Sequence, residues 1–251
     1  MNKSNTNAIE LDKYLNRVRR IPAGKFVMGS VKGDSDERPV RRIRVNAFQL
    51  GMTPVTVGMW QEYCLACGLD LPPKPRWGYL RDHPVVNVSW NDIMGADGNG
   101  GFCAWASDVT GHRWTLPTEA QWEYAARGGL QGMEYPWGDL PDKRQIHWFQ
   151  SSRNKIYTTM PVTRKSGIQR GGYGLVDMVG NVWQWCLNPY QPYATKRESP
   201  SPTSITTKIK RCVRGGSGPY YPGEYRCADR APEFPETVYN DLGFRCVVNR
   251  M

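Results

Sequence analysis

This chain of 251 residues lacks the sequence features that mark membrane-spanning, secreted and nucleic-acid-binding proteins. It contains no apolar run of about 18 residues, which a membrane-spanning helix requires, and residues 1–20 contain no apolar stretch of the kind found in a secretory signal. It also lacks the zinc-finger spacings, groove-reading motifs and repeats of dedicated nucleic-acid binders. We therefore expect no membrane span and do not favour nucleic acid as a partner. We expect a cytoplasmic location, with release into a virion or to a cell surface left open.

Cysteine and histidine occur in patterns that give neither a disulfide framework nor a metal site. The seven cysteines are an odd number without regular spacing, and the three histidines lie far apart in the sequence. Cys64 and Cys67 form a C-x-x-C pair, but a zinc site needs a second pair of ligands, which the sequence does not supply. We expect reduced thiols, with a structural role for this pair on the apolar face of a helix.

Glycine, proline and aromatic residues, in contrast, are abundant. The 26 Gly and 19 Pro exceed the roughly 12% that is usual for these two residues together, while aromatics make up 12% of the chain and include ten Trp. Disordered chains are poor in aromatics, so this composition predicts a loop-rich globular protein with an aromatic core. The net charge is +10, for which a solvated basic face is the commoner explanation.

The N-terminal part of the chain predicts one helix followed by strands. Residues 9–20 carry apolar side chains at helical spacing and are expected to form an N-terminal helix or arm. A single domain is expected to follow over residues 21–248. Strands are expected over 25–30 and 40–50, and in the second of these apolar residues alternate with Arg and Asn.

Three further helices are expected to begin at residues that cap helix N-termini. These capping residues are Thr56, Ser89 and Thr118. The helix after Ser89 is interrupted by the glycine-rich insertion 95–101, which we interpret as a loop. No helical period appears after residue 130, where Gly, Pro, Trp and Tyr dominate.

Seven segments occur in a defined order along most of the chain. They are Ile21–Ser30, His83–Asp92, Leu116–Gly129, Tyr135–Asp139, Gly172–Trp185, Arg214–Ser217 and Leu242–Cys246. This ordered set resembles the formylglycine-generating-enzyme (sulfatase-modifying factor) family. The resemblance implies an α+β fold, a variant of the C-type-lectin fold with few helices, short sheets and much irregular chain.

The resemblance also implies where a catalytic site would lie. In the family's enzymes a pair of cysteines between the RGGS-like and GFR-like segments binds copper, and thiolates are soft ligands that hold Cu(I). Here residues 218–226 read GPYYPGEYR and contain no cysteine, and Cys227 matches a cysteine outside the catalytic pair. We expect no copper site, no catalytic residue and no enzymatic activity. The alternative is a copper-dependent formylglycine-generating oxidase or another enzyme of the same fold.

A second resemblance covers residues 215–246. The pattern GGS-xxxxP-xxxRxADR-xxxxP-xxxxxx-LGFR is similar to the variable region of proteins diversified by retroelements, which display a ligand-binding surface on a lectin-type fold. It implies a fixed scaffold at Pro222, Arg226, Ala228, Arg230, Pro235, Gly243, Phe244 and Arg245. It implies an exposed ligand-binding set at Tyr220, Tyr221, Gly223, Glu224, Tyr225, Ala231, Glu233, Phe234, Glu236, Thr237, Val238, Tyr239 and Asn240.

The composition of residues 218–241 independently favours a binding surface. Tyr is concentrated there, and it offers a large contact area with few rotatable bonds and a polar tip. Acidic residues in this otherwise basic chain are expected to give the surface its own potential, namely Glu224, Asp229, Glu233 and Glu236. The alternative is an Ω-like loop that packs its own aromatics. We expect a ligand-binding protein of receptor type, with a protein rather than a small molecule as its ligand.

Calcium is the one cofactor that the family resemblance implies. Family members hold calcium through two side chains and two backbone carbonyls in the segment that matches residues 177–184. The corresponding ligands here are Asp177, Gly180, Val182 and Gln184, with Asp177 in place of the usual Asn and Gln184 in place of the usual Glu. Both side chains are hard oxygen donors, which calcium prefers.

Overall fold

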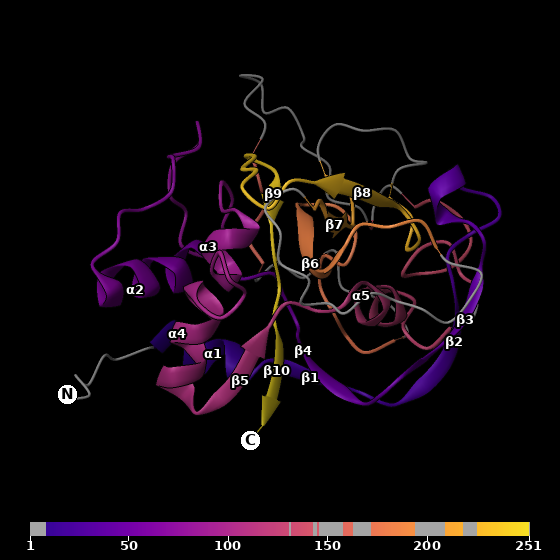
Figure 1. The fold of residues 1–251 in the computed structure, drawn as a ribbon, viewed down its shortest axis with the longest axis horizontal. Coiled ribbons are helices and arrows are strands. Elements are labelled where there is room, and N and C mark those ends of the chain that lie inside the picture. Colours follow the sequence, from indigo (N-terminus) through magenta and orange to yellow (C-terminus); the bar gives the residue numbers. More distant parts are fainter. Residues whose placement is uncertain are drawn as a thin grey trace.

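The computed structural model describes residues 9–130, 132–142, 145, 158–162, 172–193, 209–217 and 225–250. Within these ranges short helices and three small sheets are joined by long irregular segments, which is the α+β, lectin-type architecture expected from the sequence (Figure 1). The helices of the described ranges are all too short or too polar to cross a membrane.

The first sheet joins the two ends of the described chain. Its strands lie in the order β1-β4-β10-β5, with bounds Val18–Ile21, Phe48–Gly51, Val247–Arg250 and His112–Thr115. Helix α1 covers only Ile9–Leu15, and β1 then pairs antiparallel with β4. The expected helix or arm over 9–20 is therefore wrong in its second half, because β1 gains backbone partners in the sheet. Leu11 and Tyr14 are buried, so α1 belongs to the domain core, and the boundary expected after residue 20 falls inside β1.

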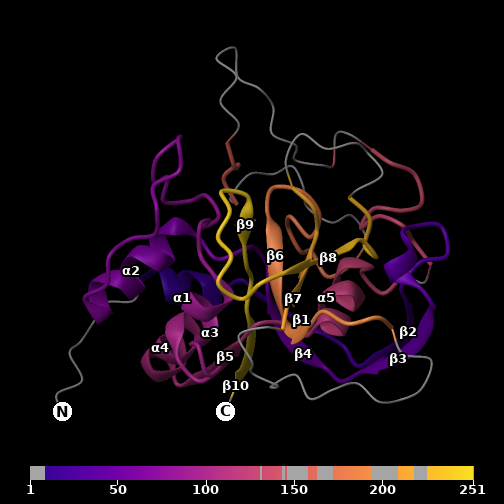
Figure 2. The same ribbon diagram turned by 45° about the horizontal axis from the view of Figure 1, so that its top comes forward.

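Four helices pack together at the side of the molecule that carries the N-terminus (Figures 1 and 2). Besides α1 these are α2 (Val57–Cys67), α3 (Trp90–Met94) and α4 (Gly101–Thr110). Thr56 and Ser89 cap α2 and α3 as predicted. The helices enclose an aromatic cluster in which the rings of Trp60 and Phe102 stack with centroids 5.4 Å apart.

The C-x-x-C pair lies at the C-terminal end of α2. Cys64 is buried, but Cys67 is exposed, which corrects the expectation that both face the core. The helix ends at Gly68, which adopts the left-handed conformation. Cys67 therefore lies in the last turn of the helix, where its side chain is exposed to solvent.

The insertion between α3 and α4 is a tight glycine-rich loop. Gly95 has φ of +79°, and a Cβ at this position would lie 2.5 Å from the backbone nitrogen of Gly100. Only glycine permits this close approach, and the loop lets the chain resume a helix at Gly101.

Strands β2 (Gly24–Met28) and β3 (Arg41–Val45) form a two-stranded antiparallel sheet. The strand expected over 40–50 is in fact two strands, β3 and β4, which belong to different sheets. The predicted alternation holds in β3, where Arg42 and Arg44 are exposed and Val45 is buried.

The third sheet lies near the centre of both views (Figures 1 and 2). Its strands are ordered β8-β7-β6-β9, with bounds Arg230–Glu233, Arg211–Arg214, Trp183–Pro189 and Leu242–Gly243. Helix α5 (Glu119–Ala126) lies against it and begins at the predicted cap Thr118, whose Oγ1 accepts a hydrogen bond from the Gln121 nitrogen at 3.2 Å. In the described residues after α5 no further helix occurs, as the sequence predicts.

Candidate functional site

The third sheet turns one face to α5 and the other face to the candidate site. Successive side chains of a strand point to opposite faces. Gln184 and Arg214 are register partners and face α5. Val213 and Ala231 are also register partners, on β7 and β8, and point to the opposite face.

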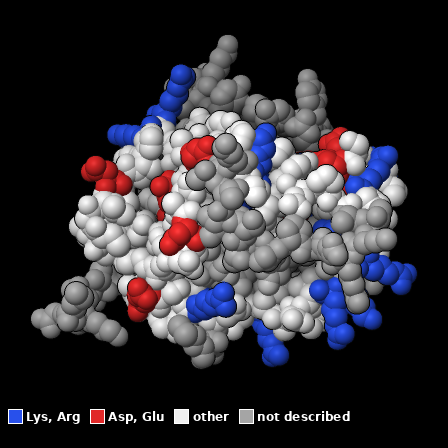
Figure 3. Space-filling model, viewed as in Figure 1, with Lys and Arg blue, Asp and Glu red and all other residues white. Residues whose placement is uncertain are grey.

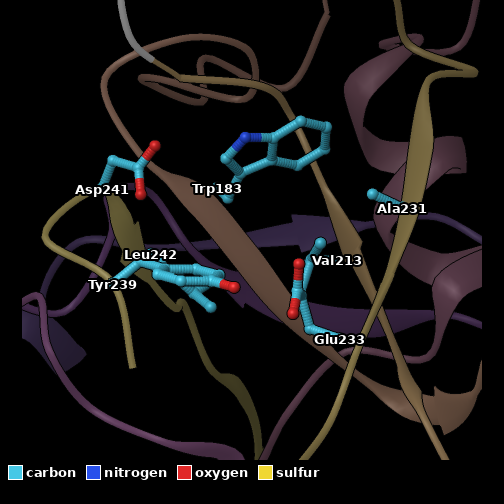
Figure 4. A pocket seen from close by; sticks show the side chains of 7 residues that line it. All are labelled: Trp183, Val213, Ala231, Glu233, Tyr239, Asp241 and Leu242. Atoms are coloured by element: carbon cyan, nitrogen blue, oxygen red, sulfur yellow. The ribbon is translucent and has the colours of Figure 1, made fainter. Parts of the chain in front are cut away.

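A hollow of about 340 Å³ opens on this second face (Figure 4). Among the described residues, strands β6, β7, β8 and β9 and the segment before β9 supply its walls. The lining residues are Trp183, Val213, Ala231, Glu233, Tyr239, Asp241 and Leu242. A concave site with aromatic and apolar walls and a few polar groups is the usual form of a ligand-binding site.

Three large apolar side chains are exposed on the chain between β8 and β9, and one of them, Tyr239, also lines the hollow. Phe234, Val238 and Tyr239 are 42%, 41% and 50% exposed, respectively. We refer to these three residues as the apolar rim. Side chains of this size are usually buried, so their grouping along one short segment marks a surface suited to contact with another molecule.

Backbone hydrogen bonds fix the segment that carries the apolar rim. The Asn87 nitrogen donates to the Tyr239 carbonyl at 2.9 Å, and the Asn91 nitrogen donates to the Pro235 carbonyl at 3.2 Å. A turn closes between Phe234 and Thr237, with a bond of 2.9 Å. The segment is thus attached to the region of α3 and its preceding loop, although it has no regular secondary structure over most of its length.

The exposed set predicted from the sequence lies in three kinds of environment. Ala231, Glu233 and Tyr239 line the hollow, and five more are exposed or half-buried on the segment between β8 and β9, namely Phe234, Glu236, Thr237, Val238 and Asn240. Tyr225 is fully buried, which corrects its assignment to the exposed set. Its ring packs in the cluster on the α5 side of the sheet. Tyr220, Tyr221, Gly223 and Glu224 lie outside the described residues.

The scaffold residues predicted from the same pattern are largely buried. Ala228, Arg230, Pro235, Gly243, Phe244 and Arg245 are buried and Arg226 is half-buried, while Pro222 lies outside the described residues. Arg245 is fully buried and donates to the Gly51, Val176 and Asp177 carbonyls at 2.8–3.1 Å. A guanidinium group satisfied in this way ties the C-terminal segment to two distant parts of the chain.

Buried ion pairs attach the sheet to α5. Arg230 forms a bidentate pair with Glu119, with N–O distances of 2.7 and 3.0 Å, and Arg214 pairs with Glu123. Burial alone would raise the pKa of the Glu119 carboxyl, but Arg214 and Arg230 lower it below its usual value. Both carboxyls come from the predicted helix after Thr118, so that helix supports the sheet on the face opposite the hollow.

The buried thiols do not fit the requirements of a copper ion. Burial raises the pKa of Cys227 to about 12, so this thiol stays protonated at neutral pH. The sequence did not indicate two further thiol pairs, Cys186 with Cys212 and Cys103 with Cys246, whose members interact through side-chain hydrogen bonds. Burial raises the pKa of Cys212 and of Cys246 as well. Copper(I) binding requires thiolates that a ligand can reach, which these buried thiols are not.

One of the expected calcium ligands, Gln184, does not fit a calcium ion in this arrangement. The Gln184 Oε1 accepts hydrogen bonds from Trp122 Nε1 at 3.0 Å and from Arg245 Nε at 2.6 Å. Its Nε2 donates to the Asp177 carbonyl at 2.8 Å, so the amide is fully engaged. The guanidinium of Arg245 brings a positive charge to the oxygen that calcium would need. In the structure Gln184 is therefore a core hydrogen-bonding residue.

Among the described residues one group of carboxylates is close enough to hold a cation. Asp34, Glu37 and Asp229 bring their oxygens within 4.8 Å of one another. Arg226 already supplies the positive charge, because its guanidinium pairs with Glu37 at 2.6 Å. Asp229 is buried in this group, which corrects the expectation that it contributes to the potential of the exposed surface.

Basic side chains gather away from the hollow. Figure 3 shows Lys and Arg side chains at the edge of the molecule where β2 and β3 lie in Figure 1. The hollow itself carries Glu233 and Asp241. The net charge of +10 therefore does not describe the local charge of the candidate site.

Four lining residues of the hollow were absent from the predicted binding set. Val213 and Leu242 lie in strands, Asp241 directly precedes β9, and Trp183 begins β6. Trp183 lies in a segment that resembles the family scaffold and was expected in the core, but it is only half-buried. Its outward direction follows from strand alternation, because the next residue, Gln184, points to α5.

Comparisons with known proteins identify both the family and the fold. Residues 8–250 match the sulfatase-modifying factor enzyme 1-like domain family. The formylglycine-generating enzyme of Thermomonospora curvata is 36% identical, with 91% of this chain and 92% of that protein covered. The serine/threonine-protein kinase pkn1 of Chlamydia pneumoniae is 32% identical over 91% of this chain, and this chain spans only 37% of its length.

Two solved structures show the same fold. PvdO from Pseudomonas aeruginosa superposes with a TM-score of 0.75 at 26% identity and covers 92% of this chain and 94% of its own. Treponema denticola variable protein 1 superposes with a TM-score of 0.72 at 22% identity, covering 93% and 95%. The likeness to the second protein concerns the fold alone. From the family match over residues 8–250, the chain belongs to the sulfatase-modifying factor enzyme 1-like domain family.

Proposed function

We propose that this chain is a non-enzymatic ligand-binding protein that recognises a protein ligand through the hollow and the apolar rim. The observation that carries the proposal is the concentration of exposed Phe234, Val238 and Tyr239 on the chain segment that also lines a hollow of about 340 Å³. Large aromatic side chains dominate the energetics of protein recognition because they bury much area with few rotors.

The support beneath this surface favours binding as well. Arg214, Arg230 and Arg245 are buried and tie the sheet to α5 and to the first sheet. A surface that is already ordered loses little conformational entropy when a ligand binds. Substitutions among the exposed residues would leave these buried bonds intact, which is what a scaffold for a varied surface requires.

The proposal extends to diversification of the surface by a retroelement. It is supported by the sequence pattern of residues 215–246 and by the burial of most of its scaffold positions. Sequencing of the DNA that flanks the gene tests it. We expect a near-copy of the DNA for 215–246 that differs mainly at adenines, next to a reverse-transcriptase gene. Flanking DNA without such a copy would contradict diversification and leave the binding function in place.

Selection from a display library of natural protein fragments tests the binding function. The full chain is the bait, and enriched fragments are measured again with a Phe234→Ala/Val238→Ala/Tyr239→Ala variant. The matched control removes three exposed apolar side chains elsewhere, as Leu65→Ala/Leu69→Ala/Val109→Ala. We expect binding at least about a hundredfold weaker for the rim variant, since each of its three anchors contributes about 1–2 kcal/mol, and wild-type binding for the control. Fragments that bind the rim variant as well as the wild type would contradict the proposal.

An oxidase of the formylglycine-generating type is the second candidate. The 36% identity to the Thermomonospora curvata enzyme over 92% of its length favours it. The lack of a cysteine in residues 218–226 and the burial of Cys227 weigh against it. Formation of formylglycine from a cysteine-containing peptide by the Cu(I)-loaded chain distinguishes the two candidates.

A further inference from the structure

The hollow next to the apolar rim combines two aromatic rings with two carboxylates. Trp183 comes from the start of β6 and Tyr239 from the segment before β9. Glu233 ends β8, and Asp241 directly precedes β9. Figure 4 shows both rings and both carboxylates around the same space. Tyr239 belongs to the apolar rim as well, but Trp183 and the two carboxylates do not, and together the four side chains indicate which part of a ligand the hollow accepts.

The described cations near these carboxylates are directed mainly to other partners. The Arg211 backbone lies opposite Glu233, but its guanidinium stacks 4.0 Å from the Trp90 ring centroid and donates to the Leu187 carbonyl. The Lys210 Nζ lies 4.8 Å from the centroid of the Phe234 ring, and neither residue lines the hollow.

The described side chains that line the hollow therefore carry a net negative charge. Burial raises the pKa of Glu233, Lys210 lowers it, and the nearby Asp241 raises it again. Asp241 accepts a hydrogen bond of 2.5 Å from the Ser217 hydroxyl, which is uncharged. Among the described residues, two carboxylates thus line the hollow, and Lys210, which does not line it, is a nearby lysine whose charge acts on Glu233.

The faces of aromatic rings and carboxylates both attract organic cations. The face of a Trp or Tyr ring carries negative electrostatic potential, and an organic cation above it gains about 0.5–2 kcal/mol. A guanidinium group adds planar stacking and directed hydrogen bonds to carboxylates. The volume of about 340 Å³ is at the lower end of ligand-pocket sizes, which suits one side chain rather than a whole cofactor.

We propose that the hollow binds a cationic side chain, the guanidinium of an arginine or the ammonium of a lysine, presented by the protein ligand. The cation lies between Trp183 and Tyr239 and is neutralised by Glu233 and Asp241. The apolar rim then contacts the neighbouring apolar side chains of the ligand. This inference rests on the proposed function, because it names the ligand group that the same surface selects.

A pair of isosteric probes tests the charge requirement directly. Nα-acetyl-arginine methylamide and its neutral analogue Nα-acetyl-citrulline methylamide are titrated into the full chain. Binding is followed by the indole NH resonances of the ten Trp residues. A Trp183→Phe variant assigns the resonance of Trp183. We expect the arginine probe, and the corresponding lysine probe, to shift the Trp183 resonance in a saturable way, with citrulline at least about tenfold weaker.

Two glutamate variants separate the hollow from the general surface charge. Glu233→Gln removes a carboxylate of the hollow, whereas Glu236→Gln removes one from an exposed position that does not line it. We expect about tenfold weaker arginine binding for Glu233→Gln and less than about twofold change for Glu236→Gln. Tyr239→Leu provides a second test if Glu233→Gln perturbs the folded spectrum.

The outcomes distinguish this inference from the proposed function. Equal binding of citrulline and arginine, or an unchanged affinity in Glu233→Gln, would overturn the cation site. If the display-selected ligands still required the apolar rim, the binding function would stand without it. Arginine binding that requires Glu233 supports the cation site whatever macromolecule is selected.

Discussion

At the scale of single residues, burial determines the chemistry that this chain can perform. Six of its seven cysteines are buried and only Cys67 is exposed, so the molecule offers solvent one thiol. We predict that one thiol per folded chain reacts rapidly with Ellman's reagent at pH 8, and that seven react in denaturant. A Cys67→Ser variant is expected to lose the rapid reaction. Rapid reaction of two or more thiols in the folded state would contradict the buried arrangement.

Asp229 is a second residue whose environment sets a measurable property. Burial raises its pKa to about 7 from a usual value of 3.8, and its Oδ2 has no hydrogen-bond partner in the part of the chain that the structure describes. Between pH 4 and 7 the folded state keeps a proton that the unfolded state releases, so the stability that this group contributes falls as the pH rises.

We predict that Asp229→Asn stabilises the chain at pH 8 by about 2–4 kcal/mol, because the variant has no buried charge to form, and much less at pH 4. Thermal unfolding of both proteins across this pH range measures the difference. A constant difference between them at all pH values would show that Asp229 does not titrate in this window.

At the scale of elements, local sequence signals predicted the helices best. Thr56, Ser89 and Thr118 cap helices as expected, because capping depends on residues three positions apart. Local signals failed where pairing with a distant strand decided the structure. Residues 18–21 continue a helical pattern but pair with β4, and 40–50 divides between two sheets. The tertiary partner of a short segment cannot be read from its own residues.

Helix α5 offers the clearest test of a predicted element. Thr118 and Gln121 form a reciprocal capping box, with bonds of 3.2 and 2.9 Å, at the start of the helix that carries Glu119 and Glu123. We predict that Thr118→Ala lowers the free energy of unfolding by about 1 kcal/mol, while Thr118→Ser retains the hydroxyl and nearly the wild-type stability. Urea denaturation measures both variants. Equal stability of the Ala and Ser variants would show that the box contributes nothing.

At the scale of the whole molecule, the family resemblance predicted the fold and much of the candidate surface. The spacing of fixed and varied residues in 215–246 placed most described varied positions outside and most scaffold positions inside. The assignment of Tyr225 to the exposed set was wrong because this residue precedes β8 and packs on the side of the sheet that faces α5. Trp183 was missed because a Trp within a family segment is most simply assigned to the core. Its exposure depends on how far β7 and β9 cover β6.

An activity assay on the whole molecule distinguishes a binding protein from an enzyme. We predict that the Cu(I)-loaded chain forms no formylglycine from a sulfatase-type cysteine peptide, because Cys227 is buried and has no cysteine in 218–226 to act with it. A formylglycine-generating enzyme assayed in parallel provides the positive control. Turnover by this chain above the level of a Cys227→Ser variant would favour the oxidase.

The most direct test of the binding function is where a selected ligand contacts the chain. Hydrogen exchange of the full chain is compared with and without a fragment enriched by display. We predict that the bound fragment slows exchange in the segment from β8 to β9, residues 230–243, and leaves exchange in helices α1 and α2 unchanged. Protection confined to α1 and α2, with none between β8 and β9, would contradict it.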